Sequence, residues 1–368
     1  MNNKTLLSIV LPTYNEKENI KPLLAEVNKI FFDKNYSYEI LFIDDSIDET
    51  PNIIQKTAKK DNHINLIHRK GKERTGLATA FIKGFKKAKG KYICCLDSDL
   101  QHPPKKMIVM LEEAIVENAD IVIASRYTKG GSAVGLDGAY RKFISIALRY
   151  FVQILFIQTR KTTDPGSGFF LFRKNILKNV KLQPRGFKIL IEILMRAKYS
   201  KVSQIPYTFL PRKNEESKAT MSQGIELLKH LWFIFTTVPE AGRFIKFCIV
   251  GGSGVIVNLG FLFVLVEYFD FNKNLAWLIS VLLSIASNFI LNNIFTYNDR
   301  KSSSHNQSIK RIIYYYLISL AVMIFNFAIY KFFMLLGFYY IVSAFIGILF
   351  STFLNFILVT KIVWKKNK

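Results

Sequence analysis

Four long stretches without charge near the C-terminal end place the strongest constraint on the fold of this chain. Three of them cover Phe247–Val266, Leu275–Phe295 and Ile312–Tyr330, and a fourth fits in the uncharged run between Lys331 and Lys361. About 20 apolar residues in a helix span the hydrocarbon core of a bilayer. Backbone polar groups find no other partners in lipid, so such spans are helical. The sequence therefore predicts an all-α transmembrane domain of four helices over residues 241–368.

Basic residues are distributed unevenly around these stretches. The connection between the second and third stretches and the C-terminal tail are rich in lysine and arginine, whereas the other two connections hold only Lys273 and Lys331. Because basic loops stay on the cytoplasmic side, we expect a multi-pass integral membrane protein with a cytoplasmic N-terminal domain. The formal net charge of +24 is then expected to attract anionic lipid headgroups, a lipid phosphate and a nucleotide diphosphate, and not nucleic acid.

The transmembrane part contains a short repeat. Asn-Phe-Ile-Leu occurs at 288–291 and again at 355–358. We therefore expect two helical hairpins of common origin, with Asn258, Asn288, Asn326 and Asn355 at equivalent depths. The alternative is chance in a segment rich in Phe, Ile and Asn. Asparagines within a membrane normally face other helices, which favours packing contacts over a polar substrate path.

The preceding part of the chain alternates strand-forming and helix-forming segments. Strand patterns occur at Leu6–Leu11, Tyr38–Ile43, Ile64–His68, Tyr92–Leu96 and Ile121–Ala124, with helical patterns between them. Such alternation is typical of an α/β domain with a mostly parallel sheet. Two further helical patterns, at about 141–157 and at 225–240, are too short and polar to span a bilayer, so we expect them to lie at the membrane interface. The expected division is a catalytic domain over 1–224, an interfacial helix or linker over 225–240, and the transmembrane domain.

The strand at Tyr92–Leu96 leads into an acidic loop, DSDLQHPP, at residues 97–104. Parallel α/β sheets bind ligands at the carboxyl ends of their strands. Asp97 and Asp99 alternate in an extended segment and so share a face. With the amide oxygen of Gln101 they are hard oxygen ligands, suited to Mg²⁺ or Mn²⁺, which in turn holds a diphosphate. An isolated D-x-D is usually only an acidic loop, but the buried strand before it and the two prolines after it favour the metal site.

Six motifs in a consistent order resemble those of a known enzyme family. They are PTYNE at 12–16, DDSIDET at 44–50, DSDLQHPP at 97–104, SRY at 125–127, DPGSGFF at 164–170 and PRKNEESK at 211–218. Together they resemble the dolichol-phosphate mannose synthases and related polyprenyl-phosphate glycosyltransferases of glycosyltransferase family 2, over roughly residues 5–235. The remainder resembles a GtrA-like domain. The resemblance implies a GT-A (Rossmann-like) catalytic domain that transfers a sugar from a nucleotide to a polyprenyl phosphate.

The resemblance also implies a donor site. The nucleotide-binding positions of the family correspond to Pro12, Tyr14, Glu16, Ile43, Asp45, Asp97, Ser98 and Asp99, with Ser98 where alanine is usual, and to Arg212 and Lys218 as a clamp on the donor phosphates. The metal positions correspond to Asp97, Asp99 and Gln101. The alternatives are that Pro12 only shapes a turn and that Arg212 and Lys218 belong to a solvated basic loop facing anionic lipid.

On the acceptor side, the resemblance implies a site for a lipid phosphate at Arg126, Arg141 and Ser145. Such a phosphate is already anionic at neutral pH, so it needs charge neutralisation and no general base. Arginine provides that neutralisation, although Arg141 could instead only reach toward lipid. The expected reaction is an inverting displacement in which the lipid phosphate attacks the anomeric carbon and a nucleoside diphosphate leaves.

Three functions remain open at this point. DLQHPP and DPGSGFF resemble the mannose-synthase branch, which favours transfer from GDP-mannose to dolichyl or polyprenyl phosphate. The alternative within enzymes is a UDP-glucose:undecaprenyl-phosphate glucosyltransferase, since GtrA-like domains accompany that activity. The alternative outside enzymes is a membrane translocase or scaffold whose soluble domain only binds a nucleotide sugar.

Overall fold

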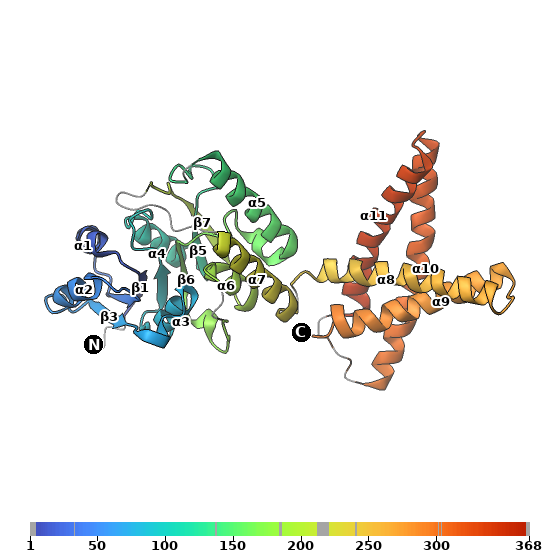
Figure 1. The fold of residues 1–368 in the computed structure, drawn as a ribbon, viewed down its shortest axis with the longest axis horizontal. Helices are drawn as coiled ribbons and strands as arrows, with labels where there is room; N and C mark the ends of the chain where they lie inside the picture. The colour runs from blue at the N-terminus through green and yellow to red at the C-terminus, as the bar shows by residue number, and fades with distance from the viewer. Residues whose placement is uncertain are drawn as a thin grey trace. The chain divides into compact units, whose positions relative to one another are not determined.

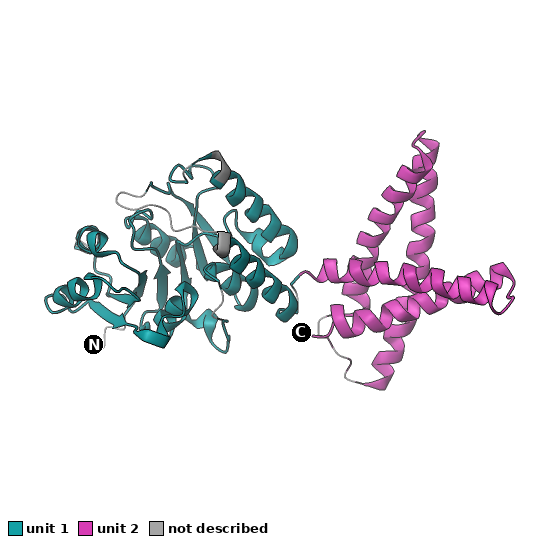
Figure 2. Ribbon diagram, viewed as in Figure 1, with its two compact units in different colours: residues 1–241 teal, residues 242–368 magenta. Residues whose placement is uncertain are grey.

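The computed structural model describes residues 5–32, 34–136, 138–183, 186–211, 221–239, 241–300, 302 and 304–365. The chain separates into two compact units, Met1–Ala241 and Gly242–Lys368 (Figure 2). The first unit is an α/β domain and the second is entirely helical. Each is described by itself below.

The first unit is built on a seven-stranded sheet of order β3-β2-β1-β4-β6-β5-β7. The strands are β1 (Leu7–Thr13), β2 (Tyr38–Asp44), β3 (Ile64–His68), β4 (Tyr92–Cys95), β5 (Ile121–Ser125), β6 (Phe170–Arg173) and β7 (Val202–Pro206). All neighbouring pairs are parallel except those of β6, which runs antiparallel to both β4 and β5. The mostly parallel sheet expected from the sequence is therefore confirmed. The reversed β6 begins at the edge where β4 and β5 end, which brings the DPGSG segment before it to that edge.

Helices cover both faces of this sheet (Figure 1). They are α1 (Lys17–Phe31), α2 (Thr50–Ala58), α3 (Leu77–Lys87), α4 (Lys106–Val116), α5 (Ala139–Leu155), α6 (Ile189–Arg196) and α7 (Met221–Thr237). Successive strand residues point to opposite faces, so Ile9 packs in one cluster with α1, α2 and α4. Its neighbour Val10 packs in the other, with α3 and α6. Both faces of β1 are buried, which explains its mostly apolar sequence.

Helices α5 and α7 leave large apolar side chains exposed. On α5 these include Phe143, Tyr150 and Ile154. Helix α7 packs against α6, where the buried Glu192 accepts a hydrogen bond from His230 at 3.1 Å. The other face of α7 exposes Trp232, which is 67% accessible. Their location at a membrane interface stays a prediction.

The second unit contains α8 (Arg243–Glu267), α9 (Lys273–Leu291), α10 (His305–Leu335) and α11 (Tyr340–Leu358). All four are long and apolar enough to cross a membrane. A π-helical turn follows α9 at Asn292–Thr296, and another follows α11 at Val359–Val363. The four-helix prediction for this part of the chain is confirmed.

The two hairpins, α8–α9 and α10–α11, repeat the same packing. The buried residues of α9, Ala276, Ser280 and Ser284, correspond to Ser343, Gly347 and Ser351 of α11, each 67 positions later. The same spacing relates the two π-helical turns and the aromatic residues after them, Tyr297 and Trp364, whose rings stack at 4.3 Å.

The asparagines follow this repeat. Asn258 accepts a hydrogen bond from Ser280 at 2.8 Å. A Cβ atom added to Gly347 would lie 2.6 Å from Oδ1 of Asn326, so this pair occupies the corresponding place in the second hairpin. The asparagines therefore lie at helix–helix contacts, as expected of polar residues in a transmembrane bundle.

Candidate active site

The acidic loop lies at the carboxyl end of β4. Asp97 is partly exposed, at 42% of its side chain, whereas Asp99 is only 8% exposed. Oδ1 of Asp99 accepts the backbone N–H of Gln101 at 3.1 Å, across Leu100 with a positive φ of 61°. This Asx-type turn holds the buried carboxylate at the edge of the sheet.

Gln101 joins this loop to the segment that follows β7. Its Nε2 donates to the carbonyl of Leu210 at 2.8 Å, and the backbone N–H of Leu210 donates to the carbonyl of Gln101 at 3.0 Å. The side-chain nitrogen is thus used in packing, and the oxygen is the atom suited to a cation. Arg212 and Lys218, two and eight residues beyond Leu210, lie outside the described residues.

His102 supports Asp97 from beneath. Its Nδ1 accepts the backbone N–H of Asp97 at 3.2 Å, and its ring is buried against the rings of Phe169, Tyr207 and Phe209. Burial lowers the pKa of His102 to about 4, so the imidazole is neutral at physiological pH. It therefore positions the loop and is not poised as a base.

The ends of β1 and β2 form the expected donor side. Tyr14 is about half exposed. The hydroxyl of Ser98 donates to the carbonyl of Pro12 at 3.0 Å and so ties the acidic loop to β1. Ile43, paired with Pro12 in the sheet, is fully buried in the core. Its side chain supports this region from below and does not present a surface for a nucleotide.

Asp45 is held by an arginine that the sequence analysis did not single out. Both of its carboxylate oxygens accept hydrogen bonds from Arg69, whose Nε lies 2.6 Å from Oδ1. Arg69 is 2% exposed and also donates to the hydroxyl of Thr79 at 2.7 Å. The neighbouring Asp44 is fully buried and contacts Nδ1 of His68 at 2.6 Å. Arg69 and His68 stand where β3 ends, and that position was the only signal for them in the sequence.

Glu16 completes this edge of the site. Its Oε2 accepts a hydrogen bond from the side chain of Asn19 at 2.7 Å, and its backbone N–H donates to the hydroxyl of Thr50 at 3.0 Å. The backbone N–H of Asn15 donates to Ser46 at 2.7 Å. The loops after β1 and β2 are therefore joined, with Tyr14, Glu16 and Asp45 in one region.

Arg126 is paired with Asp164, a residue of the DPGSG motif. Two parallel bonds of 2.8 Å join Nε and Nη2 of Arg126 to the two oxygens of Asp164, which is buried. Burial lowers the pKa of Arg126, but the ion pair with Asp164 outweighs it and raises that pKa above its usual value. The charge expected to meet the lipid phosphate is therefore already balanced by a carboxylate 38 residues away.

A small cavity of about 20 Å³ lies beside this pair and includes Ser145 and Lys188 in its lining. The hydroxyl of Ser145 is 2.6 Å from that of Tyr127. Nζ of Lys188 donates to the carbonyl of Gly166 at 2.7 Å. Burial, together with the charge of Arg126, lowers the pKa of Lys188 to about 8. Sequence reasoning missed Lys188, which sits in no motif and is recognised only by its place in the fold.

Arg149 is a second cation of this cavity that the sequence did not identify. Its guanidinium lies 5.4 Å from the centre of the Tyr127 ring. Arg141, by contrast, is in the first turn of α5 and is not among the cavity residues. The structure thus brings Arg126 and Ser145 together, adds Lys188 and Arg149, and leaves Arg141 outside this cavity.

Comparison with known proteins gives the family. Residues 8–181 match Glycosyl transferase family 2, and residues 246–364 match the GtrA/DPMS transmembrane domain. A relative from Pyrococcus furiosus, named dolichol-phosphate mannosyltransferase, is 37% identical over 97% of this chain and 99% of its own length. The chain belongs to the dolichol-phosphate mannosyltransferase family. A relative of the same name from Saccharomyces cerevisiae is 32% identical over 65% of this chain and 91% of its own length.

The resemblance drawn from the six motifs is therefore confirmed. As a member of the dolichol-phosphate mannosyltransferase family, the protein is a glycosyltransferase with a GT-A-like catalytic unit. The GtrA/DPMS domain and its four apolar helices make it an integral membrane protein. The yeast relative aligns with about two-thirds of the chain, whereas the Pyrococcus relative aligns with nearly all of it. The likeness to the Pyrococcus relative therefore extends along almost the whole chain.

Among the described residues, no three His, Cys, Asp or Glu side chains gather as a metal cluster. The site expected at Asp97, Asp99 and Gln101 would not meet that criterion, because only its two aspartates are residues of these four types. These three residues do lie together at the end of β4, and their oxygens are hard donors of the type that Mg²⁺ and Mn²⁺ prefer. The donor set therefore fits a divalent cation.

Proposed function

We propose that the protein transfers mannose from GDP-mannose to dolichyl or polyprenyl phosphate, with inversion at the anomeric carbon, to give the lipid-phosphate sugar and GDP. The observation that carries this proposal is the likeness to the Pyrococcus dolichol-phosphate mannosyltransferase, which extends over 97% of the chain. The acidic loop at the end of β4 supports it, because this edge of a parallel sheet is where nucleotides bind.

The donor side is assigned to the residues at the ends of β1, β2 and β4. Tyr14 offers a half-exposed ring for the base, and Asp45, oriented by Arg69, accepts hydrogen bonds from the base or ribose. Asp97, Asp99 and Gln101 would hold Mg²⁺ or Mn²⁺, which when bound neutralises charge on the leaving diphosphate. Arg212 and Lys218 are proposed to close over the donor phosphates and exclude water.

The acceptor side is assigned to the cavity around Lys188. A lipid phosphate carries between one and two negative charges at neutral pH, so its approach to a diphosphate requires positive charge. Because Arg126 is balanced by Asp164, the net charge here comes from Lys188 and Arg149. Ser145 donates a hydrogen bond, and Arg141 adds charge where α5 begins. One phosphate oxygen then attacks the anomeric carbon as the bond to GDP breaks, and no proton changes hands.

The exposed apolar side chains of α5 and α7 support an interfacial position for both helices. An acceptor with a phosphate head and a polyprenyl tail would then reach the cavity along α5, with its tail remaining in lipid. The catalytic unit is proposed to be cytoplasmic, because the lysine- and arginine-rich connections of the transmembrane unit favour that side.

A transfer assay tests the proposal directly. Detergent-purified protein would receive a short polyprenyl phosphate, Mn²⁺ or Mg²⁺, and labelled GDP-mannose or UDP-glucose in parallel. We expect label to enter the lipid phase from GDP-mannose alone, and the Asp99→Ala variant or added EDTA to abolish it. Transfer from UDP-glucose alone would refute the mannose assignment, and binding of either nucleotide sugar without any transfer would favour a scaffold.

A further inference from the structure

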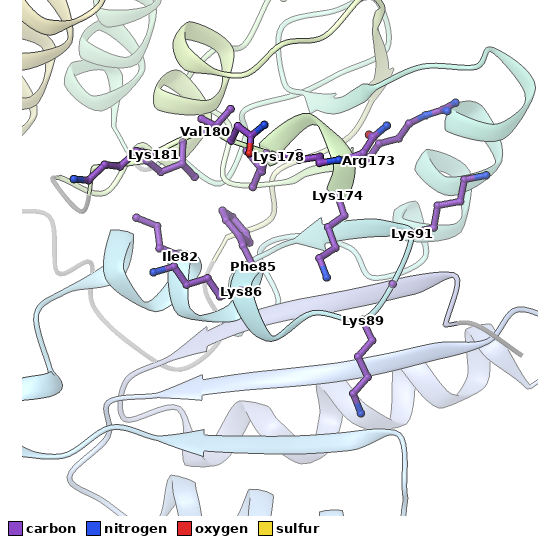
Figure 3. Close-up of a pocket in the computed structure, with 15 residues that line it drawn as sticks. Ile82, Phe85, Lys86, Lys89, Lys91, Arg173, Lys174, Lys178, Val180 and Lys181 are labelled. Carbon is purple, nitrogen blue, oxygen red and sulfur yellow. The ribbon is translucent and has the colours of Figure 1, made fainter. Parts of the chain in front are cut away.

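A second, larger cavity lies in the catalytic unit and has no part in the site described above. It has a volume of about 1030 Å³ and is lined by two segments, from the end of α3 to the start of β4 and from Arg173 to Leu182 (Figure 3). We call it the basic groove. Its volume is in the range of pockets that take small organic ligands.

The basic groove lies at the opposite edge of the sheet from the acidic loop. Strand β4 starts at Tyr92, directly after Lys91 of the groove, and ends at Cys95, just before Asp97. The antiparallel β6 ends at Arg173, again at the groove. Since a strand rises about 3.3 Å per residue, six residues separate Lys91 from Asp97 by roughly 20 Å. The groove is therefore too far away to hold the reacting groups of the donor or the acceptor.

The lining of the basic groove carries seven cationic side chains and, among the residues described there, no acidic one. Two of the seven are engaged: Arg173 lies 3.6 Å from Asp120, and Nζ of Lys174 donates to the carbonyl of Ala88 at 2.6 Å. The other five form no ion pair within the described part of the chain; they are Lys86, Lys89, Lys91, Lys178 and Lys181. Like charges gathered around a concave surface raise its potential and attract anions.

The floor of the basic groove is apolar. Phe85 points from α3 toward the segment 173–182, with Ile82 beside it (Figure 3). Leu177, Val180 and Leu182 contribute from the other side, and all three are only half-buried. Phe85 itself is only 4% exposed, so an inorganic anion would use the cations alone and leave the half-buried aliphatic side chains of this floor in water. A ligand with an apolar body would cover it, at a gain of about 25 cal/mol for each Å² of apolar area removed from water.

We propose that the basic groove binds a phosphate-bearing amphiphile, with its mono- or diphosphate group between the lysines of the two segments and its apolar body on Ile82 and the other half-buried aliphatic side chains around Phe85. The charge of the lining selects a multiply charged anion, and the floor selects an organic one. An isoprenoid phosphate and a nucleotide share this chemistry, so the two sources have to be separated by experiment.

Photo-crosslinking of the full-length protein in detergent tests this proposal, with a diazirine-bearing farnesyl diphosphate as the probe and EDTA present. We expect peptides from residues 82–91 or 173–182 to be labelled. Lys86→Glu/Lys178→Glu, with one change in each segment, should reduce that labelling at least ten-fold. The matched control is Lys59→Glu/Lys60→Glu, two exposed lysines after α2 and outside the groove, which should leave labelling unchanged. Lys86→Gln/Lys178→Gln provides a milder variant if charge reversal impairs folding.

Competition identifies the source of the ligand. Suppression by unlabelled farnesyl diphosphate but not by ADP indicates an isoprenoid phosphate, and stronger suppression by ADP than by farnesyl diphosphate at the same concentration indicates a nucleotide; either supports the proposal. Labelling that unlabelled farnesyl diphosphate does not suppress is non-specific and would overturn it. Equal suppression by pyrophosphate would overturn it, because the apolar floor would then contribute nothing. Labelling that misses both segments, or that survives both the Glu and the Gln variants undiminished, would overturn it as well.

Discussion

The ion pair between Arg126 and Asp164 offers the sharpest test of how this site is built. Asp164 is 1% exposed and accepts two bonds of 2.8 Å from the guanidinium, and a third from the backbone N–H of Arg126 at 3.2 Å. The substitution Asp164→Ala removes both acceptor oxygens and so all three hydrogen bonds. It leaves a nearly buried arginine, 10% exposed in its side chain, without a counter-charge.

Removing one partner of a buried ion pair costs about 3–5 kcal/mol, because the remaining charge stays desolvated. For a unit of this size each kcal/mol lowers the unfolding midpoint by about 2–4 °C, so Asp164→Ala should lower it by roughly 6–20 °C. Replacing both residues with apolar ones, in Arg126→Met/Asp164→Leu, removes the unpaired charge. The double variant should therefore be more stable, by about 2 kcal/mol or more, than the sum of the effects of Arg126→Met and Asp164→Leu made singly predicts.

The assay can follow the catalytic unit alone within the full-length protein. Cys94 and Cys95 are fully buried in β4, and burial raises the pKa of both thiols, so they react with a thiol reagent only after unfolding. Cys248, in the transmembrane unit, would be changed to serine in each variant used for this assay. A midpoint shift below about 2 °C for Asp164→Ala, or strictly additive effects in the double variant, would refute the assignment of the pair as a buried structural unit.

Three further predictions concern the acceptor cavity, the acidic loop and the membrane helices. The pKa of Lys188 is lowered to about 8, so its charge is largely present at pH 7 and largely lost at pH 9. The KM for the lipid phosphate should therefore rise between pH 7 and pH 9. Lys188→Arg, whose side chain stays charged, should abolish this rise. A Cβ atom added to Gly168 would lie 3.3 Å from Oδ2 of Asp97. Gly168→Ala should therefore lower the transfer rate about ten-fold by displacing the loop, with little change in the unfolding midpoint. The control Gly224→Ala, where a Cβ atom would have nothing within 4 Å, should change neither the rate nor the midpoint. A Cβ atom at Gly254 would collide with the side-chain amide of Asn288. Gly254→Val should therefore separate α8 from α9 and expose Cys248 to thiol reagent at lower temperature. Gly251→Val, where a Cβ atom would have nothing within 4 Å, should not do so.

Much of this architecture was predictable because it depends on local patterns. Burial on both faces gives β1 a mostly apolar sequence, and a span across lipid requires about 20 uncharged residues. The position of the acids followed from the same logic, since Asp97 and Asp99 come directly after β4 and ligands bind at the carboxyl ends of parallel strands. These features need only the order of residues along the chain, and the structure bears them out.

The pairing of charges was decided by tertiary structure. Arg126 looked like a cation available to a lipid phosphate, yet the antiparallel β6, inserted between β4 and β5, brings Asp164 against it. Arg69 reaches Asp45 because β3 lies beside β2, and Lys188 enters the cavity from the start of α6.

The basic groove has the same origin, since its two lysine-rich segments are separated by about 80 residues. The sequence specifies the type of each side chain. Which opposite charge lies within 3 Å of it depends on the order and direction of strands, which local periodicity does not encode.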